Sequence, residues 1–173
     1  MGKIISIFGT AGARPGDAVF ESAYKLGRLL AEAGFGIANG GYGGTMLAAA
    51  RGAAEAGGAV TGITCSAFGR GANEYISNEI RTDSLPERLQ KLIDIADGYI
   101  VLPGGTGTLL ELAEVWELKN KKFLDTSKPL VVMGDFWRPL TELMGTQDSN
   151  CLTHINEAQT PEEAVKFFTP TAM

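Results

Sequence analysis

The chain has 173 residues, of which 45% are hydrophobic and 20% charged, and its formal net charge is −5. These values are ordinary for one globular domain, which we place over residues 1–173, and they exclude collagen-like, coiled-coil and disordered chains. The acidic balance without a dense Lys/Arg cluster argues against a nucleic-acid partner, and no apolar stretch approaches membrane-spanning length, so no membrane partner is expected either.

Strand and helix patterns alternate from the start of the chain. Apolar residues 4–8 predict a first strand, and a helix with an apolar face follows over Asp17 to Ala33, with Gly34 as its stop. In chain order we then expect a strand at 36–38, a small-residue helix at 46–56 and a strand at 59–64. A polar, glycine-bearing loop continues to about Asn78, and we interpret this loop as a lid.

The alternation continues through the second half. We expect, in chain order, an extended segment at 79–82, a helix at 85–95, a strand at 98–102, a helix at 109–119, a strand at 129–133 and a short helix at 137–144. Thr160, Pro161 and Glu163 are typical of a helix start, and Phe167 and Phe168 are expected to anchor that helix to the core. The pattern as a whole predicts an α/β fold with a Rossmann-like, doubly wound parallel sheet.

Three glycine-rich turns fall at predicted strand ends, namely residues 9–12, 40–44 and 104–107. In an open parallel sheet, ligands bind outside the carboxyl ends of the strands, where the strand order reverses. Any one such turn is explained equally well by the steric needs of a tight connection. Three converging turns favour a ligand site.

The third turn is joined to a carboxylate at a fixed distance in the run 103–111, Pro-Gly-Gly-Thr-Gly-Thr-Leu-Leu-Glu. Glycines let backbone N–H groups approach an anion, and a helix start adds unpaired donors and a positive dipole end. Thr106 and Thr108 add hydroxyl donors. The run therefore predicts a phosphate site.

Glu111 follows this loop by one to two helical turns, where its carboxylate can face a sugar attached to the phosphate. Cleavage of a glycosidic bond develops positive charge on the sugar ring, and a carboxylate stabilises that charge, holds hydroxyls or directs a water. The alternative is a solvated surface residue, because Glu114 and Glu117 lie on the same helix. The sequence leaves both readings open.

Other candidate side chains also have two interpretations. Arg88 lies on the predicted helix before the strand at 98–102. In the functional interpretation it clamps a phosphate or polarises a leaving base, and in the other it is an ordinary surface arginine. Tyr42 and Phe68 either flank a base or only pack. His154 is the only histidine, which excludes a His-rich metal site, and we predict no metal site.

Several common chemistries lack their motifs. The first turn has the wrong spacing for the dinucleotide motif G-x-G-x-x-G and for the P-loop, so NAD oxidation and ATP hydrolysis are disfavoured while a bound monophosphate stays open. No lysine has a strand-end context that suggests a pyridoxal phosphate Schiff base. The two cysteines, Cys65 and Cys151, are too few for a disulfide framework and favour a reducing, cytoplasmic location.

The run 103–111 resembles the P-G-G-x-G-T-x-x-E motif of the Lonely Guy family, the cytokinin riboside 5′-monophosphate phosphoribohydrolases. Residues 40–46 look like the family's G-G-x-x-G-L-M segment. Arg88 lies fifteen residues before Pro103, where the family's M-H-x-R-K segment places its catalytic arginine. The spacing agrees along roughly residues 3 to 120.

The resemblance implies a Rossmann-like fold, usually a homodimer with the active site near the subunit interface. The implied reaction is hydrolysis of the N-glycosidic bond of a nucleoside 5′-monophosphate to free base and ribose 5-phosphate, with no metal or cofactor. Glu111 and Arg88 are the implied catalytic residues. The implied phosphate and nucleotide positions are Gly104, Gly105, Thr106, Gly107, Thr108, Gly9, Thr10, Gly41, Gly44 and Met46.

The chain also departs from the family pattern. Gly9-Thr10-Ala11 replaces the usual Gly-Ser-Ser, and Pro86 and Leu89 replace the His and Lys around Arg88. Beside Met46, the family's Leu and Gly are replaced by Thr45 and Leu47. These changes bear on the substrate more than on the fold. A non-catalytic nucleotide or molybdenum-cofactor carrier is the alternative, but a carrier has no chemical use for the Glu111 and Arg88 pair.

Overall fold

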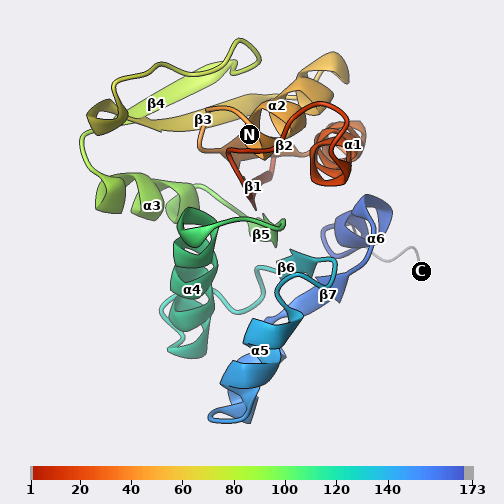
Figure 1. Ribbon diagram of the computed structural model, residues 1–173, viewed down its shortest axis with the longest axis vertical. Helices are drawn as coiled ribbons and strands as arrows, with labels where there is room; N and C mark the ends of the chain where they lie inside the picture. Colours follow the sequence, from red (N-terminus) through yellow and green to blue (C-terminus); the bar gives the residue numbers. More distant parts are fainter. Residues whose placement is uncertain (1, 170–173) are drawn as a thin grey trace.

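The computed structural model describes residues 2–169, which form one seven-stranded sheet in which every neighbouring pair of strands is parallel (Figure 1). The strand order is β4-β3-β2-β1-β5-β6-β7. The strands are β1 (Ile4–Phe8), β2 (Gly36–Asn39), β3 (Val60–Cys65), β4 (Asn78–Thr82), β5 (Gly98–Val101), β6 (Leu130–Met133) and β7 (Asn156–Ala158). The predicted Rossmann-like, doubly wound parallel sheet is confirmed.

Helices connect the strands. They are α1 (Ala18–Glu32), α2 (Thr45–Glu55), α3 (Leu85–Asp94), α4 (Thr106–Asn120), α5 (Arg138–Gly145) and α6 (Pro161–Lys166), with short 3₁₀ turns η1 (Ser66–Phe68) and η2 (Ser149–His154). Most predicted bounds agree to within one or two residues. One bound differs more, because α4 begins at Thr106, three residues before the expected start. Two elements, η2 and β7, were not predicted.

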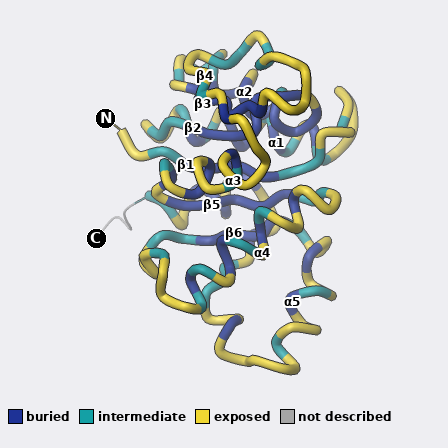
Figure 2. The backbone as a smooth tube through the Cα atoms, turned by 90° about the vertical axis from the view of Figure 1, so that its left-hand side faces the viewer, coloured by how far each residue is buried: buried dark blue, intermediate teal, exposed yellow. Residues whose placement is uncertain are grey.

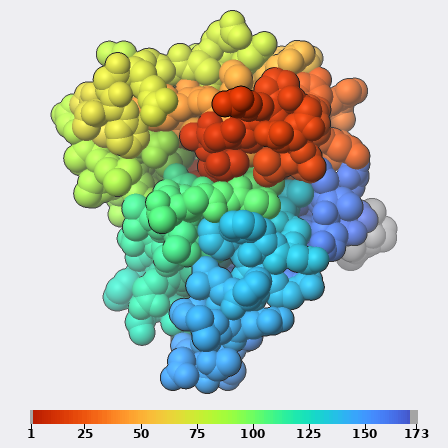
Figure 3. Space-filling model, viewed as in Figure 1, coloured from red at the N-terminus to blue at the C-terminus, as the bar shows by residue number. Residues whose placement is uncertain are grey.

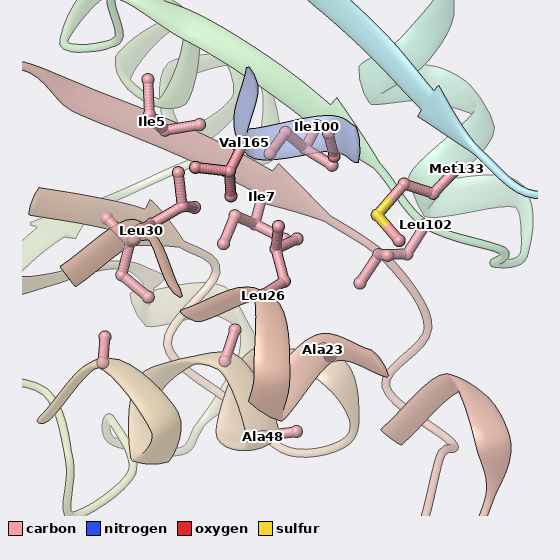
Figure 4. Close-up of a cluster of buried hydrophobic side chains, with 14 of the residues drawn as sticks. Ile5, Ile7, Ala23, Leu26, Leu30, Ala48, Ile100, Leu102, Met133 and Val165 are labelled. Atoms are coloured by element: carbon pink, nitrogen blue, oxygen red, sulfur yellow. The ribbon is translucent and has the colours of Figure 1, made fainter. Parts of the chain in front are cut away.

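Alternate residues of the central strands face two separate cores. Ile100, Val131 and their neighbours on one face pack with side chains of α1, α2 and α6, as Figure 4 shows for that cluster. Tyr99 and Val132 on the other face pack with side chains of α3 and α4. This period of two is the pattern of strands buried on both faces. Figure 2 shows that β5 and β6 are buried while the connecting loops are exposed.

The strand order reverses between β1 and β5. The chain passes outward from β1 through β2, β3 and β4, and then returns to pair β5 with β1, with Phe8 opposite Val101. The first half of the chain therefore forms the upper part of the molecule in Figure 3 and most of the second half forms the lower part. Ligands bind at such a reversal in doubly wound sheets. The first and third glycine turns both begin there.

The C-terminal helix matches its predicted start. The Thr160 hydroxyl accepts a hydrogen bond from the Glu163 N–H, and Phe168 packs edge-on against Phe35 with ring centroids 6.4 Å apart. Phe167 does not share that role, because it is 40% exposed and, unlike Phe168, does not pack against the core cluster. The prediction that both phenylalanines anchor the helix was therefore wrong for Phe167. Within residues 2–169, no helix is long and apolar enough to cross a membrane.

Candidate functional site

The third glycine turn leads directly into α4 and leaves a row of backbone donors unpaired by the helix. Its first helical hydrogen bond runs from the Leu109 N–H to the Gly105 carbonyl at 2.9 Å, so the N–H groups of residues 105–108 precede the helical ladder. At Gly105 and Gly107, a Cβ would meet no described atom within 4 Å. The helix start is thus open in front of its donors, as an anion site requires.

The two threonines of this loop differ in their surroundings. Thr106 is exposed, whereas Thr108 is buried with its hydroxyl packed over Gly104. A Cβ at position 104 would overlap the Thr108 side chain, so the glycine is required for this packing. The exposed Thr106 hydroxyl is therefore the more accessible of the two expected donors.

Glu111 lies one helical turn beyond Gly107 on the same face of α4. Its side chain is only 14% exposed, which excludes the alternative of a solvated surface residue, and Glu117 on the same helix is by contrast well exposed. Burial raises the pKa of the Glu111 carboxyl to about 7, against the smaller opposing effect of the Arg88 charge. The carboxyl group is therefore poised to gain or lose a proton near neutral pH.

Arg88 reaches the same place from α3. The Ser84 hydroxyl accepts a hydrogen bond from the Glu87 N–H and so caps the helix start that carries Arg88. The Arg88 side chain is 9% exposed, its Nε donates to the Ile63 carbonyl at 2.7 Å, and its Nη1 lies 3.9 Å from a Glu111 oxygen. This pair is too far apart for a hydrogen bond. The structure thus brings the two predicted catalytic side chains together and excludes a surface role for Arg88.

The residues that depart from the family motif around Arg88 have local explanations. Pro86 lies in the first turn of α3, where the missing N–H costs no helical hydrogen bond. Leu89 packs against the core on the α3 side of the sheet. Both substitutions are therefore compatible with the position of Arg88.

The second glycine turn is shaped around Arg88. A Cβ at Gly40 would overlap the Arg88 guanidinium and lie 2.7 Å from the Met46 sulfur, so only glycine fits there. Fully buried Asn39 organises the turn, because its amide nitrogen donates to the Met46 carbonyl and its amide oxygen accepts from the Gly41 N–H. Sequence reasoning missed Asn39. The only feature of the sequence that could have indicated it is a polar residue at the end of an apolar strand, directly before two glycines.

The first and second turns are hydrogen-bonded to each other. The Thr10 carbonyl accepts from both the backbone N–H and the hydroxyl of Thr45, at 2.9 and 3.1 Å. A Cβ at Gly44 would overlap that carbonyl, and one at Gly9 would lie 2.5 Å from the Thr45 hydroxyl. Thr45, where the family has leucine, therefore joins the two turns. The Thr10 hydroxyl accepts from the Gly12 N–H within its own turn.

Two aromatic rings, those of Tyr42 and Phe68, lie beside the Arg88 guanidinium. Tyr42 is 6% exposed, and its hydroxyl accepts a hydrogen bond from the Cys65 N–H at 2.8 Å. Phe68 lies with its ring centroid 5.7 Å from that of Tyr42, and the Arg88 guanidinium lies 5.5 and 5.7 Å from the two centroids. Asn73 fastens the loop that carries Phe68, since its side chain donates to the carbonyls of Gly41 and Tyr42. The loop interpreted as a lid is therefore hydrogen-bonded to the second turn.

A groove of about 510 Å³ lies on the side of α4 that faces α5 and η2. Most of its lining is apolar, and it includes Leu109, Leu112, Ala113, Trp116, Leu140 and Met144. Other exposed apolar side chains on the same two helices are Leu110, which precedes Glu111 in α4, and Leu143 on α5. An uncovered apolar surface of this kind is typical of an interaction face.

Together these elements offer a defined chemistry. The start of α4 provides donors for an anion, Glu111 provides a carboxyl group that titrates near neutral pH, and Arg88 provides a fixed positive charge. Within residues 2–169, no three His, Cys, Asp or Glu side chains gather as ligands for a metal ion. Glu111 and Arg88 belong to the kinds of side chain that transfer protons and stabilise charge in enzymes.

Comparison with known proteins agrees with this picture. Residues 2–165 match the model of the SLOG cluster4 family. The chain belongs to this family. A cytokinin riboside 5′-monophosphate phosphoribohydrolase of Mycobacterium tuberculosis is 34% identical over 122 residues, which are 69% of this chain and 64% of that protein. An uncharacterised protein of Archaeoglobus fulgidus is 36% identical over 117 residues, covering 68% of this chain and 76% of the relative. These findings confirm the resemblance to the Lonely Guy family.

Solved structures share the whole fold. The molybdenum cofactor binding protein of Rippkaea orientalis superposes with a TM-score of 0.81 at 26% identity, covering 97% of this chain and 96% of that one. The molybdenum cofactor carrier protein of Chlamydomonas reinhardtii superposes with a TM-score of 0.72 at 22% identity, over 96% of this chain and 95% of that one. The second likeness shows the fold alone.

Proposed function

We propose that the protein hydrolyses the N-glycosidic bond of a nucleoside 5′-monophosphate, AMP or a cytokinin riboside 5′-monophosphate, to free base and ribose 5-phosphate. The observation that carries the proposal is the buried Glu111 carboxyl, one turn from the open start of α4 and 3.9 Å from Arg88. The 34% identical phosphoribohydrolase supports the same reaction class. The chain matches only 64% of that relative's length, so the activity is inferred from the site and not transferred with the name.

The geometry suggests a role for each group. The substrate phosphate accepts hydrogen bonds from the N–H groups of residues 105–108 at the positive end of α4. The ribose then lies beside Glu111, whose carboxylate stabilises positive charge as the bond between C1′ and the base nitrogen breaks. Glu111 takes a proton from the water that adds to C1′. The Arg88 guanidinium donates hydrogen bonds to the leaving base, which finally acquires that proton.

The direct test is to incubate the purified protein with AMP and with isopentenyladenosine monophosphate and to follow free base and ribose 5-phosphate by chromatography. Glu111→Gln is the matched variant, because it keeps the size of the side chain and removes its acid–base function. Base release by the wild type that falls by two or more orders of magnitude in the variant supports the hydrolase. Release that is unchanged in the variant rejects the proposed role of Glu111.

The rival function is a non-catalytic carrier of a nucleotide or of the molybdenum cofactor. The superposition on the Rippkaea protein at a TM-score of 0.81 favours this alternative. A carrier uses the anion site but gains nothing from a buried carboxyl that remains partly protonated at neutral pH. Tight nucleotide or cofactor binding with no base release, in the wild type as in Glu111→Gln, would favour the carrier.

We also propose that two copies of the chain pair through the apolar groove along α4. Leu109 and Leu110 directly precede the site residue Glu111 and are exposed, and Leu109 also lines the groove. Leu143 on α5, the helix on the other side of the groove, is exposed as well. A second copy on this face would exclude water from the apolar groove and bring its own surface next to the substrate site. The arrangement agrees with the dimer that the family resemblance implies.

A further inference from the structure

We propose that Phe68 is the residue on which the leaving base stacks, and that it gives the site a preference for purine over pyrimidine nucleotides. This inference rests on the proposed function, since it assigns a base-binding surface to the same site. Its basis is an exposed aromatic ring that packs beside Tyr42 and lies near Arg88 at the edge of that site.

Phe68 ends the short turn η1, directly after β3. It is 42% exposed, whereas its neighbour Tyr42 is buried, so only Phe68 of the two offers a ring surface to a ligand. Gly69 takes a left-handed conformation at φ 65° and turns the chain away immediately after the ring. The ring therefore stands at the end of the turn and is not covered by the next residues.

The ring is positioned before any ligand arrives. Tyr42 supports it with ring centroids 5.7 Å apart, and Tyr42 is itself fixed by its hydroxyl on the backbone of Cys65. The side chain of Asn73 donates to the carbonyls of Gly41 and Tyr42 and so holds the loop beyond Phe68 on the second glycine turn. A prepositioned platform loses little conformational entropy when a base stacks on it.

Arg88 connects this platform to the reacting centre. Its guanidinium lies 5.7 Å from the Phe68 ring centroid and 3.9 Å from the Glu111 carboxylate. A base detached from a ribose at Glu111 therefore finds the guanidinium at its polar edge and the Phe68 ring beside its flat face. Arginine guanidinium groups and aromatic rings are common partners of nucleobases in proteins.

The strand order gives the distance between the phosphate loop and Phe68. The phosphate loop follows β5 and Phe68 follows β3, and in the strand order these two strands are three places apart. Neighbouring strands lie about 4.8 Å apart, so the two ends of the site are about 14 Å apart. A nucleotide whose phosphate lies at α4 and whose ribose lies at Glu111 would extend its base along this edge toward Phe68.

The test measures binding in the Glu111→Gln background, so that turnover does not consume the ligand. Calorimetry compares AMP, CMP and ribose 5-phosphate on chains that carry Phe68→Ala, Phe68→Trp or Phe68→Leu. Phe123→Ala is the matched control, because Phe123 is fully outside this region, past the far end of α4, and even more exposed.

We expect Phe68→Ala and Phe68→Leu to weaken AMP binding about tenfold, the usual effect of losing one base–aromatic stack. CMP should lose less, ribose 5-phosphate should bind as before, and Phe68→Trp should restore AMP binding. Unchanged AMP binding in Phe68→Ala overturns the proposal. An equal loss for AMP and ribose 5-phosphate also overturns it, because that result indicates a damaged loop.

The outcome separates this inference from the hydrolase itself. AMP binding that depends on Phe68, in a chain whose wild type releases no base, would reject the hydrolase and keep the base platform. Base release that is insensitive to Phe68, with equal rates for AMP and CMP, would keep the hydrolase and reject the platform.

Discussion

The burial of the Glu111 carboxyl group lowers the stability of the folded chain at neutral pH, because the ionised form is poorly solvated there. Its pKa is about 7 in the folded chain, against an ordinary value of 4.5, so between these values the folded state binds more protons than the unfolded state. The free energy of unfolding must then fall as pH rises from about 4.5 to about 7, by up to about 3 kcal/mol from this group. Strained electrostatics of this kind are common at functional sites.

We therefore predict that Glu111→Gln is as stable as the wild type near pH 4 and more stable by about 2–3 kcal/mol above pH 7. Glutamine does not titrate, so only in the wild type does an ionised, buried carboxylate lower the free energy of unfolding. Urea unfolding of both proteins at pH 4, 6 and 8 measures the difference. A difference that does not grow with pH would show that the carboxyl group titrates normally.

Arg88 gives a second prediction. Lysine keeps the positive charge but carries it on a single ammonium nitrogen. That nitrogen cannot donate to the Ile63 carbonyl and face Glu111 at the same time, as Nε and Nη1 of the guanidinium do. We expect Arg88→Lys to fold and to lose turnover by about two to three orders of magnitude, as for other donors that stabilise transition states. Rates of base release from AMP measure this. Arg81→Lys, on an exposed arginine, is the control and should react at the wild-type rate.

At the scale of single elements, glycine substitutions can show whether the start of α4 serves to bind a ligand or only to pack. A Cβ at Gly107 meets no described atom within 4 Å, whereas a Cβ at Gly52 on α2 would overlap the Tyr24 carbonyl on α1. We predict that Gly107→Ala keeps or raises stability by up to about 1 kcal/mol, because alanine favours a helix, and weakens ribose 5-phosphate binding by entering the anion site.

Gly52→Ala is the matched substitution with the opposite outcome. It should lower the free energy of unfolding by about 1–3 kcal/mol, since two packed helices must move apart, and should leave ligand affinity unchanged. Thermal unfolding and calorimetry with ribose 5-phosphate measure both variants. Normal ligand affinity in Gly107→Ala would remove the start of α4 from the phosphate site.

The sequence predicted the elements with strong patterns and missed those without. The alternation of strand and helix patterns predicted the doubly wound parallel sheet, and the order of its strands came only from the structure. The start of α4 was placed too late because Thr106, Gly107 and Thr108 are poor helix formers, and tertiary packing overrides that propensity. The edge strand β7, Asn156–Ala158, has no β-forming residue and pairs only with β6.

The site was predictable in part for the same reason. Motif spacing identified Glu111 and Arg88, but only the fold shows that their side chains meet across two helices. Asn39 and Asn73 act through hydrogen bonds to backbone atoms of other turns, and such bonds leave no spacing signal in the sequence. Phe68 was recognised as an aromatic loop residue, without any indication that it would be exposed while Tyr42 would be buried.

For the whole molecule, the apolar face along α4 predicts an oligomer. Leu143→Arg places a charge on the exposed part of this face and should convert a dimer to a monomer, with reduced turnover if the partner shields the site. Phe167→Arg alters an exposed apolar residue at the end of α6 and should leave the assembly unchanged. Light scattering coupled to gel filtration gives the masses. A wild type that elutes as a monomer would reject the proposed pairing.

The reversal of strand order between β1 and β5 has a consequence for how the molecule comes apart. Arg88 belongs to the half of the chain that ends before β5, whereas the anion site and Glu111 belong to the half that begins with it. A nucleotide held by both therefore bridges the central seam of the sheet and must be released before the halves can separate. Because such a nucleotide would bind the folded chain and not the unfolded one, its binding would raise the free energy of unfolding and lengthen the lifetime of the folded chain.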